Sequence, residues 1–157
     1  MVFISRGNSG NKSWCNKTKK GWLNNFFTGL PCSGKSTLAR LLFFRLLEIQ
    51  NKNITLLDGD VVRQNLSKGL KFTKKDRNTN IERIGFVANE ITKHKGIAIC
   101  SAIAPFESAR EKNRQTISEN GYYVEVYVNT PLHVCKKRDV KGLYKMAKVG
   151  KLKGMTG

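Results

Sequence analysis

The stretch "TGLPCSGKST", residues 28–37, carries the residue types of this chain that are best suited to phosphate chemistry. Gly29, four further residues, and then Gly34, Lys35 and Ser36 fit the pattern of a loop that wraps the phosphates of a nucleotide. In such a loop, backbone N–H groups and the positive end of the following helix face the phosphates. We therefore expect Lys35 to bridge the outer phosphates and Ser36 to ligate Mg²⁺. The loop does not name the phosphate acceptor, and an accidental match is the alternative interpretation.

A second group of reactive side chains, Asp58, Asp60 and Arg63, follows the apolar run "ITLL". If this run is a strand of an open α/β sheet, both carboxylates lie at its carboxyl end, beside the crevice where such sheets bind ligands. There they can hold metal-bound water or take a proton from an acceptor hydroxyl. We place Arg63 on the first turn of the next helix, where its guanidinium suits sulfate or phosphate oxygens. The alternative is that "DGD" is an ordinary turn.

The elements that position these residues follow from hydrophobic periodicity. Apolar residues at 38, 41, 42, 46 and 49 have helical spacing directly after the loop, so strand, loop and helix follow in the required order. Strands are expected at 24–29, 53–60, 97–105 and 122–128, and helices at 36–50, 76–96, 107–121 and 130–139, the last with Thr130 as its cap and Pro131 at its first position. This alternation predicts an α/β fold, a three-layer α/β/α sandwich with a parallel sheet.

Composition narrows the function classes. The 157 residues include 29 Lys and Arg against 11 Asp and Glu, a net charge of +18 that favours polyanions, anionic membranes or phosphate-rich small molecules. No recognition helix or finger pattern accompanies the charge, so we expect no specific nucleic-acid partner, and no apolar run is long enough for a membrane span. Residues 1–20 are basic and free of acidic side chains, and we expect a flexible arm there, with organelle targeting as the alternative to a cytoplasmic location.

Four segments together resemble a known family. They are "FTGLPCSGKSTLAR", "LLDGDVVRQNL", "FTKKDRNTNIERIGFVANEI" and "VEVYVNTPLHVCKKRDVKGLYKMAKVGKLKGMTG", and their order and spacing are similar to those of adenylylsulfate kinase. That family uses ATP to phosphorylate the 3′-hydroxyl of adenosine 5′-phosphosulfate in sulfate activation. The phrases "IGFVANEI" and "AIAP" are most similar to the kinase half of bifunctional ATP sulfurylase–kinase chains. The resemblance implies a P-loop kinase domain over 21–157, a lid over about 138–157, and a truncated carboxyl end that lacks the family's last helix.

The resemblance also implies a role for individual residues. Lys35, Asp60 and Lys141 match catalytic positions, and Asp60 is the candidate base or orienting group. The matches to ATP-binding positions are Gly29, Leu30, Pro31, Cys32, Ser33, Gly34, Lys35, Ser36, Thr37 and Arg138. The matches to substrate-binding positions are Asp58, Asp60, Arg63, Phe72, Arg77, Asn80, Ile103, Ala104, Lys141, Met155 and Thr156. Mg²⁺ is assigned to Ser36, with Asp58 as a second candidate ligand.

Two departures from the family pattern qualify this assignment. Ala104 stands where the family usually has a serine, so no phosphoserine can form there and direct transfer from ATP is the simpler route. Met155 replaces a phenylalanine that commonly stacks on adenine, and without the resemblance Phe72 is as well explained as a core residue. The expected partners are ATP and adenylylsulfate, with a homodimer or association with ATP sulfurylase left open. The alternative functions are a catalytically weak nucleotide-binding module and, behind it, a polyanion-binding protein.

Overall fold

The computed structural model of the chain describes residues 2–6, 22–49, 53–152 and 154–156. Its centre is a five-stranded sheet in the order β1-β5-β2-β4-β3. The strands are β1 (Val2–Arg6), β2 (Leu23–Thr28), β3 (Ile54–Asp58), β4 (Ile97–Ser101) and β5 (Tyr122–Val128). All neighbours pair in parallel except β1, which runs antiparallel to β5. The predicted parallel sheet is therefore confirmed for β2 to β5.

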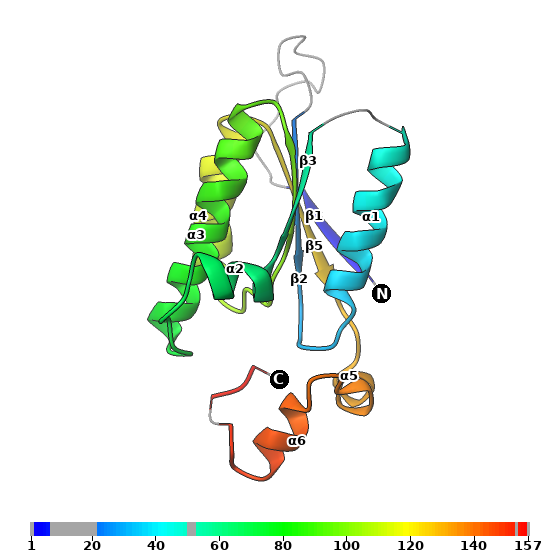
Figure 1. Ribbon diagram of the computed structural model, residues 1–157, viewed down its shortest axis with the longest axis vertical. Coiled ribbons are helices and arrows are strands. Elements are labelled where there is room, and N and C mark those ends of the chain that lie inside the picture. The colour runs from blue at the N-terminus through cyan, green and yellow to red at the C-terminus, as the bar shows by residue number, and fades with distance from the viewer. Residues whose placement is uncertain (1, 7–21, 50–52, 153, 157) are drawn as a thin grey trace.

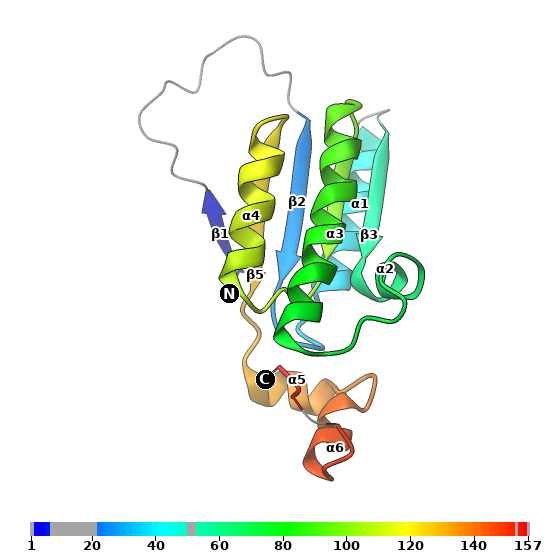
Figure 2. The same ribbon diagram turned by 90° about the vertical axis from the view of Figure 1, so that its left-hand side faces the viewer.

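Helices cover both faces of this sheet. Helix α1 (Lys35–Ile49) lies on one face, and α3 (Lys74–Lys93) and α4 (Glu107–Ser118) lie on the other (Figure 1). The short α2 (Gly59–Asn65) follows β3 directly, while α5 (Leu132–Arg138) and α6 (Leu143–Lys148) lie beyond the carboxyl ends of the strands (Figure 2). This arrangement is the predicted three-layer α/β/α sandwich. None of the helices in the described ranges is long and apolar enough to cross a membrane.

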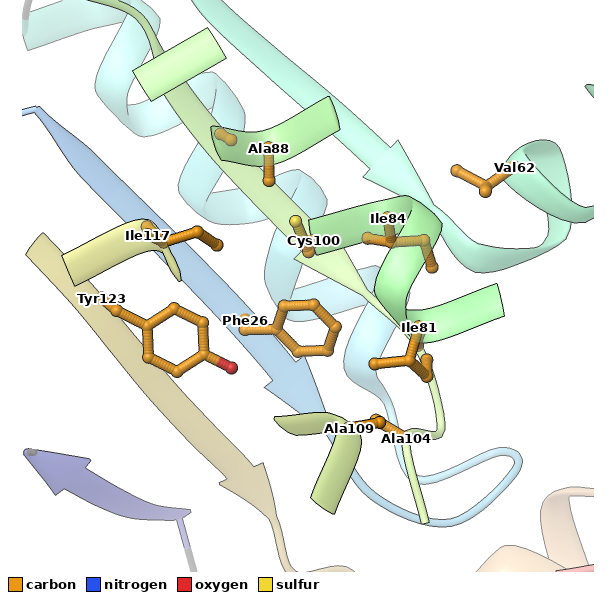
Figure 3. Packing of buried hydrophobic residues seen from close by; sticks show 12 residues of the cluster. Phe26, Val62, Ile81, Ile84, Ala88, Cys100, Ala104, Ala109, Ile117 and Tyr123 are labelled. Atoms are coloured by element: carbon orange, nitrogen blue, oxygen red, sulfur yellow. The ribbon is translucent and has the colours of Figure 1, made fainter. Parts of the chain in front are cut away.

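Two apolar clusters hold the layers together. Neighbouring residues of β2 alternate between them, since Phe26 belongs to the cluster under α3 and α4 and Phe27 to the cluster under α1. Figure 3 shows the first cluster, in which the side chains of Ile84, Ile117 and Phe26 meet between the helices and the sheet. Each such buried side chain stabilises the fold by about 1.5–3 kcal/mol. The carboxyl ends of the strands are thereby fixed as a platform for the site.

The amino-terminal residues differ from the prediction of a flexible arm. Val2–Arg6 form β1, which pairs with β5 in a register that sets Val2 opposite Val128 and Arg6 opposite Val124. The sequence "VFISR" is rich in strand-forming residues, and the outer edge of β5 offers unpaired backbone groups to it. The rest of the predicted arm, residues 7–20, lies outside the described residues.

Several predicted boundaries are wrong by a few residues. Helix α3 begins at Lys74, because the Thr73 hydroxyl accepts from the Asp76 backbone N–H at 3.1 Å and caps the helix there. Strand β4 ends at Ser101, four residues before the predicted end, and the chain turns at Ala104, whose φ is 42°.

Two predicted helix positions also need correction. Arg63 lies in the last turn of α2, because that helix begins immediately after β3 at Gly59. Thr130 is not the cap of α5: Pro131 occupies the cap position, and the Thr130 hydroxyl donates to Ser33 O at 2.7 Å. Thr130 is thus committed to the glycine-rich loop.

Candidate active site

A cavity of about 830 Å³ opens at the carboxyl ends of β3, β4 and β5, where Asp58, Ser101 and Val128 line it. The glycine-rich loop, the start of α2, the segment after β4 and the helices beyond the sheet all contribute to its walls. The predicted site residues that line it are Pro31, Cys32, Ser33, Gly34, Lys35, Ser36, Thr37, Asp58, Asp60, Arg63, Phe72, Arg77, Asn80, Ile103, Ala104, Arg138 and Lys141. Most residues that were singled out in the sequence are therefore brought to one place.

The loop's conformation depends on its first glycine. Gly29 has a φ of 140°, and a Cβ added there would lie 2.7 Å from Val128 O, so a larger residue meets both strain and a clash. Cys32 also has a positive φ, of 60°, although it is not glycine. Such positions persist only where the surrounding contacts hold them.

Those contacts reach the loop's carbonyl groups from two directions. The Lys35 ammonium donates to Leu30 O at 2.6 Å, and the Tyr144 hydroxyl donates to Pro31 O at 3.1 Å. Tyr144 belongs to α6, so a helix more than a hundred residues away in sequence fastens the loop. Sequence analysis missed this residue, and its only signal was its place in "KGLY".

The far end of the loop is held by Arg138 and Thr130. Arg138 Nη1 donates to both Cys32 O and Ser33 O at 3.3 Å, and the Thr130 hydroxyl also donates to Ser33 O. The C=O and N–H groups of a planar trans peptide point in opposite directions. We infer that the Gly34 N–H, in the same peptide as Ser33 O, faces away from these donors, as a phosphate-binding loop requires.

Lys35 is buried in this loop, with 8% of its surface exposed. Burial lowers the pKa of its ammonium from 10.5 to about 8, partly offset by the neighbouring Cys135, Cys32 and Asp60. Among the residues that the structure describes, the ammonium donates to Leu30 O at 2.6 Å and to Ser33 Oγ at 3.4 Å. A phosphate that arrives beside Lys35 would supply the charge partner that burial demands.

Oxygen donors suitable for Mg²⁺ lie beside the loop. The hydroxyls of Ser36 and Ser101 are 3.1 Å apart, and Asp58 Oδ1 accepts from the Asp60 backbone N–H at 3.0 Å as the cap of α2. In the described ranges no group of three or more His, Cys, Asp or Glu side chains gathers as a metal cage. Mg²⁺ commonly uses one or two protein oxygens together with substrate phosphates. Ser36 with Asp58 or Asp60 fits that mode, and Ser101 is an addition that the sequence did not suggest.

Asp60 and Lys141, two predicted catalytic residues, form an ion pair with each other. The pair joins the start of α2 to the segment between α5 and α6, and both side chains are more than half exposed, at 66% and 54%. An exposed pair of this kind contributes about 0–1 kcal/mol. It is therefore weak enough for a ligand to separate.

An aromatic side chain and two cationic side chains gather elsewhere on the lining of the cavity. The guanidinium of Arg63 lies 4.6 Å and that of Arg77 5.6 Å from the centre of the Phe72 ring. Phe72 is 56% exposed, so it is not a core residue. The ring and the two nearby guanidinium groups together offer a flat apolar surface beside positive charge.

Four predicted substrate residues, and two predicted residues of the loop, have surroundings that the sequence did not predict. Arg77 donates to Thr156 Oγ1 at 2.8 Å and to Gly154 O at 2.6 Å, so it holds the carboxyl-terminal segment. Thr156 and Met155 are not among the residues that line the cavity, and neither are Gly29 and Leu30 of the loop. Asn80 is buried, and its Oδ1 has no hydrogen-bond partner among the described residues. A buried unpaired acceptor on a cavity wall is a place for a ligand's N–H or O–H group.

Comparison with known proteins agrees with this geometry. A family model described as adenylylsulphate kinase matches residues 23–157. The adenylyl-sulfate kinase of Microcystis aeruginosa is 51% identical over 132 residues, which are 84% of this chain and 71% of that protein. A sulfate adenylyltransferase of Aspergillus oryzae is 45% identical over the same share of this chain but only 23% of its own length.

A solved structure gives the same answer for the fold. The Mycobacterium tuberculosis APS kinase CysC, in complex with AMPPNP and APS, has a TM-score of 0.83 and 35% sequence identity, over 87% of this chain and 79% of that one. The family model spans the loop, the acidic pair and the helices beyond the sheet, all of which meet at the cavity. The chain belongs to the adenylylsulphate kinase family.

Proposed function

We propose that this protein is an adenylylsulfate kinase that transfers the γ-phosphoryl group of ATP to the 3′-hydroxyl of adenosine 5′-phosphosulfate. The observation that carries the proposal is the shared cavity, whose lining includes both the phosphate loop with Lys35 and the Phe72 surface with its two arginines. The acidic start of α2 lies on the wall of the same cavity. A donor and an acceptor nucleotide can therefore meet in one cavity, as in-line transfer requires.

On the donor side, residues 29–37 hold the ATP phosphates through backbone N–H groups, and Lys35 supplies positive charge to the outer phosphates. Arg138 fixes the loop through Cys32 O and Ser33 O, so its role begins before ATP arrives. Mg²⁺, held by Ser36 with Asp58 or Asp60, would neutralise charge on the transferring phosphate.

On the acceptor side, Arg63 and Arg77 suit the phosphosulfate, and Phe72 suits the base or sugar of adenosine. The unpaired Oδ1 of Asn80 accepts a hydrogen bond from the same nucleotide. Asp60 accepts or orients the proton of the attacking hydroxyl. Because position 104 is alanine, no enzyme-bound phosphoserine forms there, and the phosphoryl group passes directly from ATP.

The ion pair between Lys141 and Asp60 separates during this reaction. Lys141 then turns from the carboxylate toward the phosphates, and the segment that carries it, residues 138–157, works as a lid. This exchange has a small free-energy cost, because the exposed ion pair is weak and a phosphate replaces the carboxylate as the partner of the ammonium.

A coupled assay of ADP release tests the proposal. The protein, with Mg-ATP, is given adenylylsulfate or, as matched acceptors, AMP and adenosine, and a Lys35→Ala variant provides the control. We expect ADP release only with adenylylsulfate. In the variant we expect the rate to fall about a hundredfold or more, the typical cost of removing one preorganised donor that stabilises charge in a transition state. A folded protein that binds ATP without acceptor-dependent ADP release would instead be the catalytically weak nucleotide-binding module.

We also keep three wider expectations as proposals: the cytoplasmic location, a homodimer, and association with an ATP sulfurylase. Light scattering of the purified protein, alone and mixed with an ATP sulfurylase, measures the last two directly. A mass of 17.7 kDa for the protein alone would exclude the homodimer at the concentration used. A mixture that shows only the two separate proteins, with no heavier species, would exclude the association.

A further inference from the structure

The segment that follows β4, residues 102–105, forms one wall of the cavity. Within it, Ala104 is buried and has a φ of 42°. A residue with a Cβ rarely adopts this left-handed conformation unless its surroundings hold it there. The wall therefore needs an anchor, and the contacts of Ala104 identify one.

Arg110, on α4, connects this wall to the sheet. Its Nη1 donates to Ala104 O at 2.8 Å, and its Nε donates to Glu125 Oε1 at 2.9 Å. Glu125 is a buried residue of β5. Because the donors of a guanidinium lie in one rigid plane, fixing Nε on the carboxylate also fixes the direction of Nη1. Arg110 thus transmits the position of a buried carboxylate to the Ala104 carbonyl.

Arg114 provides a natural comparison within the same cluster. It donates to the other oxygen of Glu125 at 3.0 Å, so it also fastens α4 to β5. Arg114 also contacts Glu111 at 3.2 Å and the face of the Tyr123 ring at 5.1 Å, and neither of these residues lines the cavity. Of these two arginines, Arg110 is the one whose contacts include the wall.

The wall is also in contact with the phosphate loop. The Gly29 N–H donates to Ile103 O at 3.5 Å, and the Ala102 N–H donates to Phe27 O at 3.1 Å. The segment is thus supported by the central strand β2 on one side and by Arg110 on the other. A loss of either support would change the shape of the cavity between them.

We propose that Arg110 is a positioning residue that holds residues 103–105 in the shape needed by the acceptor nucleotide, without touching that nucleotide. Arg110 is absent from the cavity lining, so its effect passes through the Ala104 carbonyl. This inference rests on the proposed function, because the identity of the acceptor comes from it.

Steady-state kinetics with Mg-ATP and adenylylsulfate test the inference on three variants: Arg110→Met, Arg110→Lys and the matched control Arg114→Met. For Arg110→Met we expect the KM for adenylylsulfate to rise about tenfold or more. A change of this size corresponds to the loss of one charge-assisted hydrogen bond. The KM for ATP should stay within about twofold of its value in the unmodified protein. The KM of Arg110→Lys for adenylylsulfate should lie between those of Arg110→Met and the unmodified protein, because lysine cannot bond to both partners in the same planar geometry. Arg114→Met should leave both KM values within about twofold.

Hydrogen exchange of the unliganded protein supplies a readout that does not need activity. The backbone amides of residues 102–104 should exchange faster in Arg110→Met than in the unmodified protein. In Arg114→Met their exchange rates should be unchanged. If no adenylylsulfate-dependent transfer occurs even in the unmodified protein, the proposed function fails while this measurement still decides whether Arg110 holds the wall. Equal changes in the two methionine variants, in KM or in exchange, would mean that the arginines only fasten α4 to the sheet. If Arg110→Met does not fold, the KM and exchange of Arg110→Lys decide in the same way.

Discussion

Raising the pH from 7 to 9 should weaken ATP binding, because the loop lysine loses its charge in this range. Burial lowers the pKa of Lys35 to about 8 in the unliganded protein. A bound phosphate stabilises the charged ammonium and raises that pKa, so the charged form is the one that binds. ATP binding is therefore accompanied by proton uptake, and the affinity for ATP falls as the pH rises through 8.

The magnitude follows from the fraction of protein that carries the charge. With a pKa of about 8, about nine tenths of the lysine is charged at pH 7, about half at pH 8 and about one tenth at pH 9. If only the charged form binds, the apparent Kd scales inversely with this fraction. The Kd for ATP should therefore rise about tenfold between pH 7 and pH 9.

Titration calorimetry in buffers of different ionisation enthalpy measures both quantities at once, the Kd and the protons taken up. At pH 8 we expect an uptake of about half a proton per ATP. Lys35→Arg is the control, because a guanidinium stays charged throughout, and its Kd should be independent of pH in this range. A Kd for the unmodified protein that changes by less than twofold, with no proton uptake, would refute the reasoning that burial brings the pKa of Lys35 to about 8 and that ATP binding restores its charge.

Three further predictions follow from packing and charge. Gly85→Ala should lower the free energy of unfolding by about 1–3 kcal/mol, because the added Cβ would lie 2.0 Å from Asn113 Oδ1. Chemical denaturation measures this change. A second substitution, Asn113→Ala, should restore part of the lost stability. Asn24→Val should raise the midpoint of thermal unfolding, because the fully buried Asn24 Oδ1 has no hydrogen-bond partner among the described residues. An unpaired buried acceptor costs about 1–3 kcal/mol of stability. An unchanged or lower midpoint would show that this oxygen has a hydrogen-bond partner. Lys141→Met should lower kcat while changing the free energy of unfolding by no more than about 1 kcal/mol, because its exposed pair with Asp60 is weak; parallel kinetics and denaturation separate the two effects.

Much of the architecture was predictable because it depends on local patterns. The glycine loop is followed by a helix with apolar residues at helical spacing, and α1 spans Lys35–Ile49, one residue from the predicted bounds of 36–50 at each end. The acidic pair lies at the carboxyl end of β3 because parallel strands that alternate with helices end on one edge. These conclusions need only periodicity and the order of motifs.

The remaining features depend on contacts between distant parts of the chain. The sequence around Thr130 is typical of a helix cap, but in the structure its hydroxyl donates to Ser33 O, which is 97 residues away in sequence. Tyr144 and Ser101 carry no pattern of their own, and their hydrogen bonds to the loop exist only after folding. Val2–Arg6 pair with β5 because that strand has a free edge, which the local composition of residues 1–20 does not reveal.

The measurement that tests the central claim most directly is identification of the product. Adenylylsulfate and Mg-ATP are incubated with the protein, and phosphorus NMR and mass spectrometry then locate the new phosphate. We expect one 3′-phosphorylated adenylylsulfate for each ADP formed, and neither product with Lys35→Ala. ADP that accumulates with free phosphate and unchanged adenylylsulfate, from a folded protein, would contradict the account.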